Sequence, residues 1–429
     1  PRTSLGSFVV GVRVFQLADS AFVGQLGRDP LAALGFTLPM QQLIIGLQVG
    51  LGIATTAIVS RTLGAGDELR AFRLGGLIIT VGGSLVFVIC VALWFLQGPI
   101  MTALSAEDSL LPLIRQYWVP WLMAAWTGAF LYFGYSVCRS HGDTKLPGYM
   151  MVATSLTNIA LDPLYIFVFG WGLPGAAWAT VTSFGIGCLV IYPKLLKRHW
   201  VRFDLRELAL WKALKQLNGI MAPAMVSQLM PAVSAMLATA LVAGFGSAAV
   251  AAWGLGTRLE FFSIVVVLAL TMSMPPMIGR LLGAGDIEQI RKLVRLAVRF
   301  VVVWQLAIGL TWVVASGLVS ELFSSDSDVQ KVLAGYLVRV PLSYSGLGVC
   351  MLMVSVCNAL GLAMRALLVS TLRLFLCFLP LLWIGSQING VYGLMSGALV
   401  GNLFAGAMAY SFYRAGMTRL KAELASGKA

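Results

Sequence analysis

Long runs of apolar residues separated by short polar stretches fill this chain of 429 residues. A helix that crosses the hydrocarbon core of a bilayer needs about 20 consecutive apolar residues. Twelve segments are long enough, within a few residues at each end: 4–25, 34–59, 74–97, 112–137, 147–170, 173–193, 219–243, 249–278, 294–318, 332–357, 364–386 and 391–413. The strict alternation typical of a membrane barrel is absent from the sequence. The pattern therefore predicts an all-α polytopic membrane protein with twelve transmembrane helices.

The second half of the sequence repeats the first. Arg61–Asp67, with the sequence RTLGAGD, recurs as Arg280–Asp286, with RLLGAGD, at an offset of 280 − 61 = 219. Ser136–Cys138 recurs as Ser355–Cys357 at the same offset. The Gly-Ala-Gly-Asp stretch predicts a helix end at glycine, followed by an aspartate that caps the next helix.

This repeat predicts two six-helix bundles: an N-lobe at 1–193 and a C-lobe at 219–429, joined by a basic cytoplasmic connector at 194–218. Six spans is an even number, so both lobes enter the membrane from the same side. They are then related by a pseudo-two-fold axis along the membrane normal. Two such bundles would leave a central cleft and alternate its access by rocking.

Charge sets the orientation. The chain is 59% hydrophobic and only 11% charged, with a net charge of +13. Lysine and arginine concentrate in the loops after the second, sixth and eighth spans and in the C-terminal tail, which places those loops and both termini in the cytoplasm. The bias also accounts for the net charge through contact with anionic lipid heads, so no nucleic-acid partner is expected.

Three of the seventeen acids lie well inside predicted spans: Asp19, Asp162 and Glu260. A carboxylate at that depth is costly and indicates a functional site. The first two have no acid at the matching positions of the second half. Because these two acids occur in only one of the two repeated halves, we expect the N-lobe to be the half that binds and releases charge.

Asp162 has polar neighbours in the sequence. Asn158 precedes it by four residues and shares its helix face. Pro163 has no N–H to donate to the carbonyl of Ile159, so a kink is expected there. The short connection that follows brings Thr180, on the next helix, toward the same pocket.

If Asp19 and Asp162 lie close together in a low dielectric, they cannot both stay charged. A shared proton would neutralise the pair. A sodium ion ligated by Asp19, Asn158, Asp162 and Thr180 would do the same, and sequence does not choose between them. The structural alternative is that both acids bond only to Arg13 or to the backbone.

A second group of residues is a candidate lining for the cleft. Glu260 matches Gln41 at the repeat offset, so this position is polar in both halves. Flexible methionines suit a surface that accepts many apolar shapes. The candidates are Gln16, Gln41, Gln228, Glu260, Met225 and Met230. A bond that joins helices is an equally good interpretation of Glu260.

No catalytic chemistry is indicated. The zinc-protease, nucleophile-elbow and phosphate-loop motifs are all absent from the sequence, so neither an enzyme nor an ATP-driven pump is expected. No cofactor is expected beyond H+ or Na+ as a coupling ion. The six cysteines fall in or beside apolar spans and are interpreted as small apolar residues, without disulfides or metal: Cys90, Cys138, Cys188, Cys350, Cys357 and Cys377.

Two stretches carry a resemblance to a known family. Leu17–Gly27 (LADSAFVGQLG) resembles the first-helix signature of multidrug and toxic compound extrusion (MATE) transporters. Asn158–Pro163 (NIALDP), followed by Gly175–Thr180 (GAAWAT), is similar to their fifth and sixth helices. The resemblance covers essentially the whole chain and is best for the branch named after the DNA-damage-inducible protein F.

The resemblance implies a secondary antiporter of the bacterial inner membrane. It would expel small, amphipathic, mostly cationic drugs in exchange for H+ or Na+, and a monomer suffices. The family's cation site carries over to Asp19, Asn158, Asp162 and Thr180. Span one lacks the proline often found before its acid, so a bend on protonation is not implied. The seventh and tenth spans lack the acids that other branches place there, which favours coupling through the N-lobe alone.

Two other interpretations compete with an exporter. A flippase of a lipid-linked intermediate belongs to the same superfamily, but it would need a strongly cationic cleft, for which only Arg13 and Arg258 are candidates. An intramembrane prenyl transferase would need Asp-x-x-Asp clusters, which the sequence lacks.

Overall fold

The computed structural model describes residue 26 and residues 28–103, 111–204 and 208–425. The chain folds into two compact units, Pro1–Met221 and Ala222–Ala429. We call these the N-lobe and the C-lobe. The division predicted from the sequence, into lobes at 1–193 and 219–429 with a connector at 194–218, stays a prediction.

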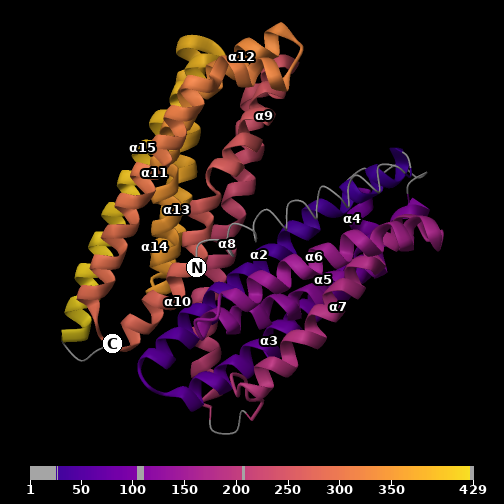
Figure 1. Ribbon diagram of the computed structural model, residues 1–429, viewed down its shortest axis with the longest axis vertical. Coiled ribbons are helices and arrows are strands. Elements are labelled where there is room, and N and C mark those ends of the chain that lie inside the picture. Colours follow the sequence, from indigo (N-terminus) through magenta and orange to yellow (C-terminus); the bar gives the residue numbers. More distant parts are fainter. Residues whose placement is uncertain (1–25, 27, 104–110, 205–207, 426–429) are drawn as a thin grey trace. The chain divides into compact units, whose positions relative to one another are not determined.

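The described part of the N-lobe is helical (Figure 1). Its elements are α2 (Arg28–Gly64), α3 (Glu68–Phe95), α4 (Gln97–Ala103), α5 (Leu111–Ser140), α6 (Lys145–Pro163), the π-helix η1 (Leu164–Val168) and α7 (Gly172–Lys197), with α8 (Leu210–Ala243) continuing into the C-lobe. Helix α5 packs against α2, α3 and α7. Trp118 and Phe133 of α5 are fully buried, so α5 is the centre of this lobe.

The C-lobe is helical as well. It contains α9 (Ser247–Ser263), α10 (Val265–Gly283), α11 (Ile287–Phe323), α12 (Ser327–Arg339), the 3-10 helix η2 (Val340–Ser343), α13 (Tyr344–Ala359), α14 (Ala363–Leu372), the π-helix η3 (Arg373–Phe378) and α15 (Leu379–Ala425). Helix α13 packs against α10, α11 and α15. Its buried side chains make α13 the counterpart of α5.

Among the described residues, nine helices are long and apolar enough to cross a membrane. The predicted first span, 4–25, lies outside the described residues, and the other eleven fall on helices. Two differences account for nine instead of eleven: α5, on the predicted span 112–137, is not among the nine, and the last two spans are counted together as Ala363–Ala422. The backbone leaves helical geometry at Asn389 and Gly390, where Gly390 has a φ of 57°, and the chain reverses there. Gly397 then lies against Leu381 and Gly401 against Cys377, so the two spans are antiparallel neighbours.

The predicted span 249–278 is divided into α9 and α10 at Ile264. Two side chains of α11 bind the polar groups at this break. The Gln305 amide donates to the Ser263 carbonyl oxygen over 3.1 Å, and the Trp312 indole donates to the Ser263 hydroxyl over 2.8 Å. Partners from another helix make an interrupted helix tolerable inside a membrane, and the sequence of this span alone could not reveal them.

The repeated Gly-Ala-Gly-Asp turns form as predicted. Gly66 and Gly285 adopt left-handed backbone with φ of 83° and 77°. The carboxylate of Asp67 accepts the N–H of Arg70 over 3.1 Å, and that of Asp286 accepts the N–H of Gln289 over 3.0 Å. Each aspartate therefore caps the helix that follows. All six cysteines are free thiols.

Candidate functional site

The candidate coupling site lies where α6 ends. Asn158 and Asp162 are both fully buried there and face the same side of α6. Pro163 closes α6, and the next five residues wind into the π-helix η1. A proline cannot donate to the preceding turn, and π-helical turns are frequent at functional sites. The helix type therefore changes at the position where the sequence predicts a kink, and the kink itself stays a prediction.

Glycines place α7 against this region. Gly170 and Gly172 have φ of 69° and 58°, which lets the chain reverse over a few residues. A Cβ on Gly175 would lie 2.8 Å from the Tyr165 carbonyl oxygen, so only glycine allows this approach to η1. Thr180, one turn further along α7, then reaches the buried face of α6.

The Asn158 amide lies between Asp162 and Thr180. With its nitrogen toward Asp162, Nδ2 donates to Oδ2 over 3.1 Å. The amide oxygen then accepts from the Thr180 hydroxyl over 3.1 Å and from the Thr180 N–H over 3.2 Å. The structure thus brings together three of the four residues predicted to couple transport. Asp19, the fourth, lies outside the described residues.

This amide can also be turned the other way. Its Nδ2 then donates to the Thr180 hydroxyl over 3.1 Å, while that hydroxyl donates to the Ala176 carbonyl over 3.1 Å. The amide oxygen now faces Asp162, an arrangement that is favourable only if the carboxyl carries a proton to donate. In this orientation, however, Nδ2 also lies 3.2 Å from the Thr180 N–H, donor against donor. The hydrogen bonds therefore favour the orientation with Nδ2 toward Asp162.

The predicted cleft residues are spread over several helices. Gln41 is half-buried on α2 in the N-lobe. In the C-lobe, Met225 and Met230 are half-buried on α8, and Gln228 on the same helix is exposed. Gln16 lies outside the described residues.

Glu260, on α9, belongs to a C-lobe cluster that sequence reasoning largely missed. Its carboxylate accepts from the Tyr336 hydroxyl on α12 over 3.3 Å. Tyr344 on α13 and Arg373 on η3 lie close enough to act on the same carboxylate. An arginine near the middle of the predicted span 364–386 was the signal that could have indicated this cluster, because arginine at such depth needs a partner.

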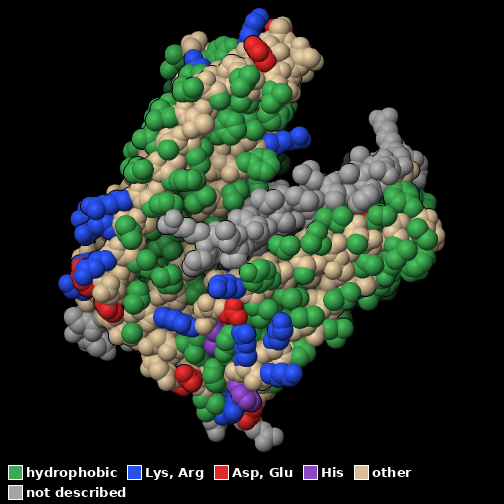
Figure 2. Space-filling view, viewed as in Figure 1, with side chains coloured by type: hydrophobic (Ala, Val, Ile, Leu, Met, Phe, Trp, Pro, Cys, Tyr) green, Lys and Arg blue, Asp and Glu red, His purple; other side chains and the backbone are tan. Residues whose placement is uncertain are grey.

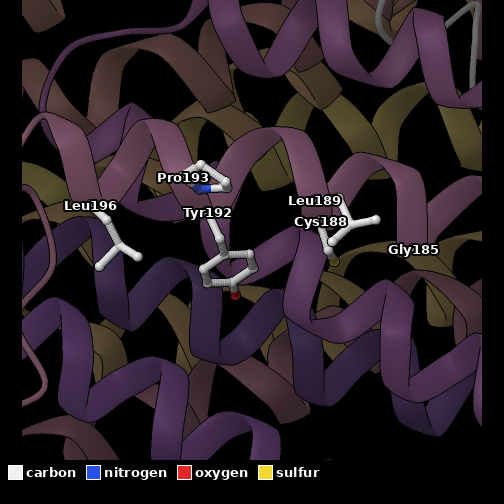
Figure 3. Close-up of a pocket in the computed structure, with 6 residues that line it drawn as sticks. All are labelled: Gly185, Cys188, Leu189, Tyr192, Pro193 and Leu196. Carbon is white, nitrogen blue, oxygen red and sulfur yellow. The ribbon is translucent and has the colours of Figure 1, made fainter.

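The outer face of α7 has a shallow hollow (Figure 3). Its lining comes from one helix: Gly185, Cys188, Leu189, Tyr192, Pro193 and Leu196. The Tyr192 hydroxyl donates to the Phe130 carbonyl of α5 over 2.8 Å, so its polar atom is already bonded. The remaining surface is apolar and resembles the rest of the helix surfaces, which apolar side chains cover in Figure 2.

A family model described as MatE matches residues 9–164 and 223–384 of this chain, more than half of its length. The chain belongs to the MatE family. The MATE transporter VcmN of Vibrio cholerae, in a crystal structure of its bent form, is 50% identical with a TM-score of 0.95. That match covers 98% of this chain and 96% of VcmN.

Two curated relatives extend the comparison. The FAD transporter of Shewanella oneidensis is 32% identical over 92% of this chain and 89% of its own length. The probable multidrug resistance protein YpnP of Bacillus subtilis is 26% identical over 94% of this chain and 91% of its own.

These matches confirm the family that the sequence motifs indicated, although the DinF-like branch stays a prediction. This MatE protein is a multi-pass membrane transporter, not an enzyme, and its all-α fold is that of MATE transporters, with twelve transmembrane helices in two bundles.

Proposed function

We propose that this MatE protein is a secondary active exporter of amphipathic compounds, driven by H+ or Na+ that enters at Asp19, Asn158, Asp162 and Thr180. It would work as a monomer in a bacterial inner membrane, with both termini in the cytoplasm. Ion binding in the N-lobe would change which access state of the two lobes is favoured.

The observation that carries the proposal is the complete burial of Asp162 within a membrane-spanning segment. An ionised carboxylate there is costly, and a proton or a monovalent cation removes that cost. The oxygens of Asp162, Asn158 and Thr180 also suit Na+, which prefers oxygen ligands.

Two cargo classes are supported by the names of relatives. Several of the curated relatives are named as multidrug resistance or export proteins, which favours drugs as cargo. That these drugs are amphipathic and mostly cationic stays a prediction from the sequence. The Shewanella relative is named as an FAD transporter, which favours a flavin dinucleotide as a second candidate. Export of a lipid-linked intermediate stays an alternative.

Dye export from everted vesicles tests the coupling. Asp162→Asn keeps the volume and a polar head but cannot exchange a proton, and Asp19→Asn does the same at the other acid. We expect each substitution to reduce export against a gradient to the background of vesicles without the protein. Vesicles given only a pH gradient, and then only a sodium gradient, identify the ion.

Glu68→Gln is the matched control, because Glu68 is an exposed acid in the first turn of α3. It should export like the unmodified protein. Full export by both aspartate variants, at equal protein amounts, would show that the coupling assignment is wrong.

A further inference from the structure

An exposed arginine lies at membrane depth in the C-lobe. Arg258 is on α9, two residues before Glu260, whose carboxylate accepts from Tyr336 and lies near Arg373. Arg373 is near the middle of the predicted span 364–386, and two residues of helix rise by only about 3 Å. Half the hydrocarbon core is about 15 Å thick, so Arg258 lies within it. Its side chain is nevertheless exposed.

Arg258 makes no ion pair or hydrogen bond with any other residue in the described part of the chain. A guanidinium turned toward acyl chains would be strongly unfavourable, and such residues face a polar passage in membrane proteins. The neighbouring Thr257 is exposed as well. The exposed face of α9 at this level is therefore suited to water and polar solutes.

Two further arginines lie at similar depth in the same lobe. Arg373 is on the π-helix η3, close to Glu260. Arg339 ends α12, where its guanidinium donates to the Gly335 carbonyl over 3.0 Å and lies 5.2 Å from the Tyr392 ring centroid. Glu260 can balance only one of these charges. The middle of the C-lobe therefore carries an excess of positive charge, with Arg258 as its exposed member.

The surface beside Arg258 combines space with an aromatic ring. Gly254, one turn earlier on the same face, is open: an added Cβ would meet nothing within 4 Å. Phe262, one turn later, is 63% exposed. A guanidinium between open space and an exposed ring matches a molecule with an acidic group attached to a flat apolar body.

We infer that Arg258, with Gly254 and Phe262, forms a recognition site for amphipathic organic anions, in which the guanidinium binds a carboxylate or phosphate and the ring contacts the apolar part. This inference rests on the proposed transport function and assigns residues to the anionic part of its cargo, the class to which a flavin dinucleotide belongs. Glu260, two residues away and turned inward to Tyr336, does not oppose the bound anion directly.

Equilibrium binding to the purified protein tests the site without depending on ion coupling. Two dyes share an anthracene ring and carry opposite single charges: anthracene-9-carboxylate, an anion, and (anthracen-9-ylmethyl)trimethylammonium, a cation. Fluorescence anisotropy gives the Kd of each. We expect Arg258→Gln to raise the Kd of the anionic dye at least about tenfold, as for the loss of one charge-assisted contact. Binding of the cationic dye should be unchanged or tighter.

Arg258→Lys keeps the charge and should retain most of the anionic binding. Arg299→Gln is the matched control, since Arg299 is an exposed arginine of the same lobe, nearer the cytoplasmic end of α11. The inference is overturned if Arg258→Gln changes both dyes alike or neither. Full export by Asp162→Asn in the vesicle assay would refute only the coupling assignment. It would leave the anion site untouched, because equilibrium binding is measured without an ion gradient.

Discussion

Three glycines at four-residue spacing form one face of the second half of α15: Gly393, Gly397 and Gly401. This face lies against the backbone of the first half of the same helical element. A Cβ on Gly397 would lie 2.6 Å from the Leu381 carbonyl carbon and closer still to its oxygen. Small residues at this spacing let transmembrane helices approach through their backbones. Gly397→Ala is therefore expected to force the two final spans apart.

The size of the effect follows from that distance. Carbon atoms in contact are about 3.5–4.0 Å apart, so the backbone must shift by about 1 Å. Overpacking of this kind costs about 1–3 kcal/mol. Alanine is favoured over glycine in a helix by up to about 1 kcal/mol, which offsets part of that cost. We expect a net loss of about 1–2 kcal/mol in the free energy of unfolding of the C-lobe.

Gly317→Ala is the matched control in the same lobe. Gly317 is an exposed residue of α11, and a Cβ there would meet nothing within 4 Å. It should be neutral or stabilising by up to about 1 kcal/mol. The two variants should therefore differ by about 1–3 kcal/mol. For a unit of 429 − 221 = 208 residues, each kcal/mol shifts Tm by about 2–4 °C, so their Tm values should differ by about 2–12 °C.

Thermal unfolding in detergent, followed by a dye that becomes fluorescent on reacting with thiols, measures this difference. Cys350 and Cys357 of the C-lobe are buried and free, so they react only as the lobe opens. If Gly397→Ala melts at or above the temperature of Gly317→Ala, the close backbone approach does not exist and the reasoning fails.

Two further predictions concern the N-lobe. Burial alone would raise the pKa of Asp143, but the Leu146 N–H and the Arg198 guanidinium, 2.7 Å away, hold that pKa below its usual value. A carboxyl whose pKa is lowered in the folded state stabilises the fold at pH values above the unfolded pKa of about 3.9, and this stabilisation is lost as the pH falls. Asp143→Asn should therefore reduce the free energy of unfolding by about 0.5–1 kcal/mol at neutral pH and leave it unchanged in acid. Equal losses at both pH values in thermal unfolding would contradict this. Thr180→Val removes the hydroxyl that bonds the Asn158 amide and should reduce dye export, whereas Thr180→Ser should retain it; export by Thr180→Val at the level of the serine variant would show that the hydroxyl is not used.

Much of the candidate site could be predicted from the sequence. Asn158, Asp162 and Pro163 follow one another at helical spacing, and the glycines after them predict a short turn. Local geometry alone therefore indicates one polar face and a near neighbour on the next helix. The orientation of the Asn158 amide depends on where Thr180 lies in space, so only the structure shows how the three groups share their hydrogen bonds.

The C-lobe cluster shows the limit of that approach. Glu260 was recognised as an acid inside a predicted span. The residues that act on it, Tyr336 and Arg373, lie 336 − 260 = 76 and 373 − 260 = 113 residues further along the chain. Nothing in the spacing of residues within one helix specifies such a contact. The division of α9 from α10 was missed for the same reason, because Gln305 and Trp312 of another helix stabilise the break.

The sequence by itself determined the number of spans, the duplicated lobes and the capped turns after Gly66 and Gly285, because each depends on apolar length or on backbone preferences within a few residues. Tertiary packing alone decided where a span breaks, which glycines meet backbone and which distant side chain balances Glu260. In a membrane almost every lipid-facing residue is apolar, so hydrophobicity specifies that a helix spans but not which neighbour it contacts.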